Sequence, residues 1–126
     1  MTALASDLVG LGTPGPLARY LGLSAPTTVV AAGTTAAGAT AINPQLTFVV
    51  ADTATSQTGL SLPADAPIGR PIWITNPDSD TAVIYPSSGA SLNGGTVTTA
   101  GQNLAQNKTA IYIRQTTAKW LSILTA

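Results

Sequence analysis

The sequence predicts a mainly β protein, a small antiparallel β-sandwich or barrel of five to six strands that follows a short N-terminal helix and an extended arm. Three observations predict this fold class. Short runs of alternating apolar and polar residues recur in the second half of the chain, and turn-forming residues separate them. Helix and strand patterns do not alternate along the chain, as they would in a protein with a parallel sheet. The length of 126 residues suits one domain with one core.

Residues 1–24 form the first predicted element, a short helical docking segment. Leucines recur near helical spacing on both sides of a Gly- and Pro-rich break at residues 12–16. A helix this short is marginal alone in water, where about 12 to 15 residues are needed, so its apolar side chains require a surface to dock on. The residues expected to make this contact are Leu8, Leu11, Leu17, Tyr20 and Leu21.

Residues 25–44 are expected to form an extended arm. The segment consists mostly of Ala, Gly, Thr and Pro and holds few large side chains. Burial within such a segment cannot offset the conformational entropy that ordering its backbone costs. We therefore expect the arm to become ordered against another surface.

The antiparallel β domain is expected at residues 45–126. Its first strand is predicted at residues 45–51, where large apolar residues stand at every second position. Asn, Pro and Asp favour a turn at residues 76–80, and residues 115–118 favour a hairpin between the last two strands. The other expected strands are 71–75, 81–85, 110–114 and 119–124, with a brief sixth at 96–99. The residues expected to form the core are Ile72, Ile74, Val83, Ile111, Ile113, Leu121 and Ile123.

The composition argues against catalysis. The chain contains no His, Cys or Glu, and its five acidic residues are all Asp. Catalysis near neutral pH usually uses His, a thiolate or a pair of carboxylates with shifted pKa values. We therefore expect a non-enzymatic protein that uses no cofactor and no metal.

The charge pattern narrows the range of partners. Charged residues make up 8% of the chain, whereas an ordinary soluble domain has about 25%. The five basic residues are scattered, so they form no stripe that could neutralise a run of phosphates. No stretch has the length and apolarity of a membrane span or of a signal-peptide core. We expect no nucleic-acid or membrane partner, synthesis in a cytoplasm, and little repulsion between neighbouring subunits.

Two Asp-containing motifs suggest chemistry, and each has a simpler structural explanation. Asp52-Thr53-Ala54 follows a predicted strand, as the Asp-Thr-Gly loop of aspartic proteases does, but Ala54 replaces the glycine and a dimer would be needed to supply the second carboxylate. Asp78 and Asp80 could ligate a hard cation, but their loop lacks the other ligands of a calcium-binding loop. A polar turn explains each motif better.

Four aromatic residues on the predicted strands could line a glycan-binding face. Such residues more often belong to a core or an interface, where the polar edge of the ring finds a hydrogen-bond partner. The residues are Trp73, Tyr85, Tyr112 and Trp120.

Several separated segments together carry a resemblance to a known class of protein. They are residues 59–63 (GLSLP), 69–76 (GRPIWITN), 83–94 (VIYPSSGASLNG) and 119–123 (KWLSI). This series resembles a β module that recurs in small structural proteins of tailed bacteriophages. Residues 7–14 (DLVGLGTP) with Leu17 and Ala18 are also similar to a short leader found on virion proteins of this kind. The resemblance implies a virion component without catalytic residues.

These observations favour a capsid decoration (cement) protein that binds and stabilises the assembled phage head. The chain lacks a long repetitive shaft, and an extended arm can bury much area per residue on a preassembled surface. We expect a homotrimer on the capsid surface of the virion, with the major capsid protein as partner and residues 1–58 clamping neighbouring capsid subunits. The alternatives are a head-fibre, tail-fibre or adaptor module, a glycan-binding receptor-recognition module and, more remotely, an aspartic-protease-like dimer.

Overall fold

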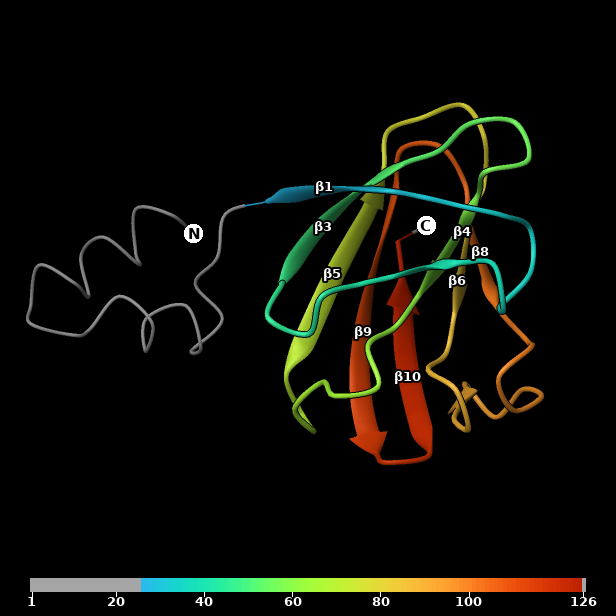
Figure 1. Cartoon of the computed structure of the whole chain (residues 1–126). Helices are drawn as coiled ribbons and strands as arrows, with labels where there is room; N and C mark the ends of the chain where they lie inside the picture. Colours follow the sequence, from blue (N-terminus) through green and yellow to red (C-terminus); the bar gives the residue numbers. More distant parts are fainter. Residues whose placement is uncertain (1–25, 126) are drawn as a thin grey trace, which may run out of the picture.

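Residues 26–125 are described by the computed structural model, in which two β-sheets share one core (Figure 1). Sheet A contains, in spatial order, β1 (Thr27–Val30), β3 (Phe48–Asp52), β5 (Pro71–Asn76), β9 (Lys108–Thr116), β10 (Lys119–Leu124) and β7 (Ser91–Leu92). Sheet B contains β2 (Thr40–Ala41), β4 (Gly59–Ser61), β6 (Ala82–Tyr85) and β8 (Gln102–Leu104). The helix expected within residues 1–24 lies outside the described residues.

The first six strands alternate between the two sheets. Each successive pair, β1 with β2, β3 with β4 and β5 with β6, forms one coil of a solenoid-like stack. β1, β3 and β5 are parallel neighbours in sheet A, and β2, β4 and β6 are parallel neighbours in sheet B. Backbone hydrogen bonds also join successive coils at their corners, for example from Ala31 N to Asp52 O at 2.8 Å and from Thr58 N to Gly33 O at 3.0 Å. The later strands β8 and β9 then add antiparallel to β6 and β5, and β10 adds antiparallel to β9.

The mainly β class is confirmed, but the expected antiparallel sandwich or barrel is not, because the sheets are mixed. Parallel neighbours need a long crossover connection, which is usually a helix. In this chain the crossover between two parallel strands of one sheet is a short strand of the other sheet, as β2 is between β1 and β3. A parallel arrangement therefore needs no helical pattern in the sequence.

The strands with strong β composition lie close to where the sequence predicts them. The predicted strand at 119–124 has the bounds of β10, and those at 71–75 and 81–85 differ from β5 and β6 by one residue. β9 and β10 form the expected hairpin. The brief strand expected at 96–99 is a turn, and the short strands of the second half that the sequence analysis missed are β7 and β8.

The core is only partly composed of the residues that the sequence predicts. Ile72 and Ile74 are buried, but Leu121 and Ile123 are 46% and 65% exposed. Ile111 and Ile113 are half-buried on the same side of the sheet as these two residues, and Val83 is half-buried on β6. The side chains that fill the core from the last two strands are instead Ala110, Tyr112 and Trp120. The predicted face of this hairpin was wrong because both of its faces are apolar, so alternation alone cannot choose between them.

The described part of the expected arm contributes strands to both sheets. β1 pairs with β3 over four residues, and β2 pairs with β4 over two. Two side chains from this range, Ala31 and Ile42, are 2% exposed and belong to the core cluster. Residues 26–44 thus form the first coil of the folded domain, in which two short strands are joined through a turn at residues 34–39.

Candidate functional site

The five residues expected to dock on a partner, Leu8, Leu11, Leu17, Tyr20 and Leu21, lie outside the described residues. The described part of the chain holds three other features that could form a site. These are the corner that holds several Asp residues, a small cavity at one end of sheet B, and the outward side of sheet A.

Asp78 and Asp80 participate in a corner that is held together by hydrogen bonds. The Thr53 backbone N–H donates to Asp78 Oδ2 at 2.8 Å, and the Thr53 hydroxyl donates to Asp80 O at 3.0 Å. Asn76 Oδ1 accepts a bond from Asp78 N at 3.1 Å, which forms the Asx turn that residues 76–80 predict. Asp52 is exposed at the end of β3. Among residues 26–125 no group of three metal-binding side chains gathers, at this corner or elsewhere.

The four aromatic residues do not share one face. Tyr85, Tyr112 and Trp120 are 7%, 0% and 1% exposed, and each uses its polar edge inside the protein. Their partners are Thr34 O, Gln102 Oε1 and Ser87 Oγ, at 2.8, 2.7 and 3.1 Å. Trp73 alone of the four is exposed, at 40%. The glycan-binding face drawn from these four rings is therefore not formed.

Tyr112 is also the described residue whose ionisation is most affected by the fold. Its ring lies in the core, and burial raises the pKa of the hydroxyl well above its ordinary value of 10.0. Burial disfavours the charged phenolate, because the interior solvates charge poorly. The hydroxyl remains protonated and donates to Gln102.

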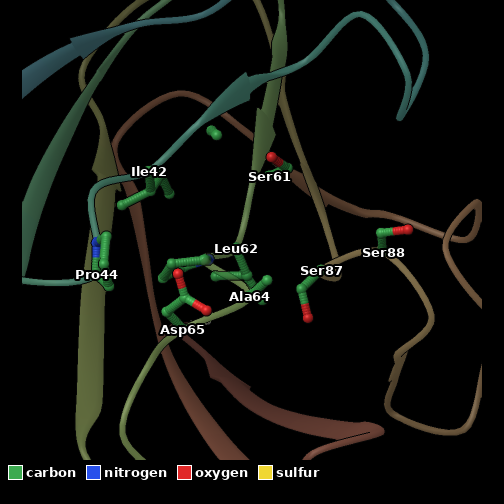
Figure 2. Close-up of a pocket in the computed structure, with 10 residues that line it drawn as sticks. Ile42, Pro44, Ser61, Leu62, Ala64, Asp65, Ser87 and Ser88 are labelled. Atoms are coloured by element: carbon green, nitrogen blue, oxygen red, sulfur yellow. The ribbon is translucent and has the colours of Figure 1, made fainter.

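A cavity of about 310 Å³ opens where the β2–β3 connection, β4 and the loop after β6 meet (Figure 2). Its volume is near the lower limit for sites that bind small molecules. Apolar and small side chains line most of it, including Ile42, Leu62 and Pro63. Asp65 is the charged residue of the lining, and Ser87 is already engaged with Trp120. This arrangement provides no hydrogen-bonded pair of nucleophile and base.

The outward side of sheet A is a broad apolar surface, which we call the outer face. Strand pairing places one row of large side chains across four strands, with Phe48 beside Trp73, Trp73 beside Ile111 and Ile111 beside Ile123. A second row crosses β5, β9 and β10 and consists of Pro71, Ile113 and Leu121. The outward residues, which the alternating burial of these strands identifies, are Thr28, Val30, Phe48, Val50, Pro71, Trp73, Thr75, Thr109, Ile111, Ile113, Leu121 and Ile123.

These residues are uncharged, and the outward charge beside them on β3 is Asp52, which ends the strand and is paired with Val30. An exposed apolar surface that covers several strands is uncommon on a monomeric soluble protein and typically marks an interaction site. The outer face spans four strand spacings from β1 to β10, or roughly 19 Å at about 4.8 Å each. It is the strongest candidate for a functional surface in the described part of the chain.

Sequence reasoning assigned part of this surface to the core. The signal that could have identified it is the apolar character of both faces in residues 110–124, since a strand that packs on one side only needs one apolar face. The second apolar face then requires a partner. The size of the side chains could have identified the inner face of the hairpin, because Tyr112 and Trp120 are its largest residues.

Comparison of the chain with protein-family models, with curated proteins and with solved structures gives no match. Within residues 26–125 there is also no helix with the length and apolarity to cross a membrane.

Proposed function

We propose that this protein is a non-enzymatic structural component of a tailed-phage virion, a capsid decoration protein that binds the assembled head. The observation that carries the proposal is how the segments of the resemblance lie in the fold. The segment at 83–94 is hydrogen-bonded both to the segment at 59–63, from Leu62 N to Tyr85 O, and to the segment at 119–123, from Trp120 Nε1 to Ser87 Oγ. These segments meet in space as parts of one packing arrangement.

The residues of the resemblance serve to hold the module together. Asn93 has a positive φ of 51°, donates to Ser122 Oγ at 2.8 Å and accepts a bond from Ser122 N at 3.0 Å. Asn76 and Trp120 are fully buried, and both are hydrogen-bonded. A motif whose conspicuous residues are used for packing and turns favours a structural role over a catalytic one.

In the proposed mechanism, the protein stabilises the shell by linkage. A protein that binds the assembled, expanded capsid and not its free subunits stabilises the assembled state in proportion to the binding free energy. The N-terminal segment docks on the major capsid protein through Leu8, Leu11, Leu17, Tyr20 and Leu21, and the β domain projects as one member of a homotrimer. The small number of charges on the chain suits close packing of copies.

Co-sedimentation with capsids tests this function. The full chain is mixed with expanded capsids and, separately, with unassembled capsid subunits of the same phage. We expect saturable binding to capsids, with deletion of residues 1–24 lowering the affinity at least about tenfold, the loss that removal of about 1.4 kcal/mol produces. A matched control carries Ala3→Ser, Ala5→Ser and Ala18→Ser, which change the same segment and leave its large apolar side chains in place.

Two results would contradict the proposal. One is undiminished occupancy after the deletion, which would remove the N-terminal segment from the interface. The other is density at the portal, the tail or a spike in images of the particle, which would favour the fibre or adaptor module. Glycan binding has one supporting observation, the exposure of Trp73, and it predicts that soluble glycans protect this residue from fluorescence quenching.

A further inference from the structure

The outer face of sheet A has no partner within the described residues. Trp73, Leu121 and Ile123 are 40%, 46% and 65% exposed, and they lie close together because Trp73 and Ile123 both neighbour Ile111 while Leu121 neighbours Ile113. Side chains of this size stabilise a protein by about 1.5 to 3 kcal/mol each when they leave water completely. A rigid sheet carrying several of them side by side is well suited to protein–protein contact.

The absence of charge over the middle of this face favours an identical copy as its partner. In a symmetric assembly, residues near the symmetry axis face the same residues of other copies. A charge at such a position would face a like charge and weaken the contact. The outward positions in the middle of the face, from Thr28 on β1 to Ile123 on β10, are apolar or threonine, and the outward charge of Asp52 stands at the end of β3. Copies can therefore meet over the middle of this face without such repulsion.

The charges at the border of the face are complementary to one another. β3 and β10 run in the same direction, because each is related to β9 through antiparallel pairing, directly for β10 and through the parallel pair β3–β5 for β3. Asp52 is the last residue of β3 and Lys119 the first of β10, and both are exposed. They therefore lie at opposite ends of the face and on different strands, where a second copy can bring its lysine to the aspartate of the first.

We propose that the outer face of sheet A is a self-association surface and that a second copy of this chain covers it. Trp73 lies at the centre of the contact, flanked by Phe48 and Ile111, with Asp52 and Lys119 at its border. The inference rests on the proposed function only in that the function calls for several copies. Its test uses free protein without capsids, so the two proposals can fail separately.

The test compares the mass of the wild-type chain with that of two lysine variants, by light scattering after gel filtration and by sedimentation. Ile123→Lys places a charge on the outer face. Val97→Lys makes the same change at a position that is 55% exposed in the loop between β7 and β8, away from this face. We expect the wild type and Val97→Lys to be oligomers and the Kd of Ile123→Lys to rise at least about tenfold.

A second variant and an optical measurement guard against misfolding. The double variant Leu121→Thr, Ile123→Thr retains residues that favour strands, and its far-ultraviolet circular dichroism should match the wild type. The contribution of Trp73 to acrylamide quenching is the difference between a protein with and without Trp73→Phe. This contribution should at least double in the double variant, or when the wild type is diluted to monomer. Buried Trp120 should stay protected.

Three outcomes would overturn the inference. The first is a monomeric wild type at concentrations up to about 100 µM, well above the Kd of an ordinary specific interface. The second is an oligomer that Ile123→Lys leaves intact. The third is an increase in Trp73 quenching after deletion of residues 1–24 with the number of chains per particle unchanged, because the chain's own N-terminal segment would then be the cover.

Discussion

Asn76 shows how single polar residues fix the corners of this fold. Its side chain is fully buried, and its Nδ2 donates to Asp80 O and to Leu104 O, both at 2.9 Å, while its Oδ1 accepts from Asp78 N. One amide thus joins the end of β5 to the following turn and to β8. A buried amide with all these partners stabilises its surroundings, whereas an unpaired one would cost about 1–3 kcal/mol.

At the same scale, Tyr112 predicts how stability depends on alkaline pH. Burial raises the pKa of its hydroxyl in the folded state, so the folded protein holds the proton more tightly than the unfolded chain does. The stability linked to this proton is complete below pH 10 and is lost as the pH rises above the unfolded value. The free energy of unfolding should therefore fall by up to about 1.4 kcal/mol per pH unit above pH 10.

Urea unfolding between pH 8 and 11.5 measures this dependence. The control is Tyr112→Phe, which lacks the hydroxyl and its bond to Gln102 and should be somewhat less stable at pH 8. Its alkaline slope should be shallower than that of the wild type by the contribution of one proton. Parallel slopes for the two proteins would show that Tyr112 does not determine the alkaline behaviour.

At the scale of single elements, β4 depends on close contact with the coil before it. A Cβ added at Gly59 would stand 2.8 Å from the backbone oxygen of Ala32, closer than real Cβ atoms approach such an atom. Ala32 also donates its N–H to Gly59 O at 3.0 Å, so the two segments cannot separate without loss of this bond. We expect Gly59→Ala to destabilise the protein by about 1–3 kcal/mol in urea unfolding.

Gly38→Ala is the matched control for Gly59→Ala, because it lies in the same pair of coils. Its added Cβ would meet Thr35 Oγ1 at 3.7 Å, an ordinary van der Waals distance. This variant should stay within about 0.5 kcal/mol of the wild type. Equal effects at the two glycines would mean that the close approach of the coils is not what Gly59 provides.

The comparison of sequence and structure is also clearest for individual elements. β5, β6 and β10 were predictable because β-branched and aromatic residues are concentrated in them. β2 and β4 were not, because two or three residues are too few for a pattern and their Thr, Ala, Gly and Ser resemble a loop in composition. β1 consists of β-branched residues but was missed because the Ala- and Gly-rich residues that follow it dominate the segment. Likewise, Phe48, Ile111 and Ile123 could be recognised as strand residues, but their common outward side follows only from strand pairing across the sheet.

At the scale of the whole molecule, the alternation of strands between two sheets makes every coil part of one core. Val49 and Ala51 of β3 are paired with β1 and belong to the same core cluster as Ala31 and Ile42, and Leu60 of β4 is paired with Thr40 of β2. The boundary between the folded domain and any docking segment therefore falls before β1. A protein of this design can vary the segment before β1 independently of the body that carries the outer face.

Truncation at two points tests where that boundary lies. Deletion of residues 1–24 keeps every strand found within residues 26–125, and the product should unfold in one cooperative transition near the wild-type Tm. Deletion of residues 1–43 removes β1 and β2 and with them Ala31 and Ile42, and it exposes the edges of β3 and β4. Loss of a buried Ile side chain alone costs about 2–5 kcal/mol, so the second product should have a Tm lower by at least about 10 °C or fail to fold. Equal Tm values in differential scanning calorimetry would instead make residues 26–43 an arm that merely lies against an independently stable domain.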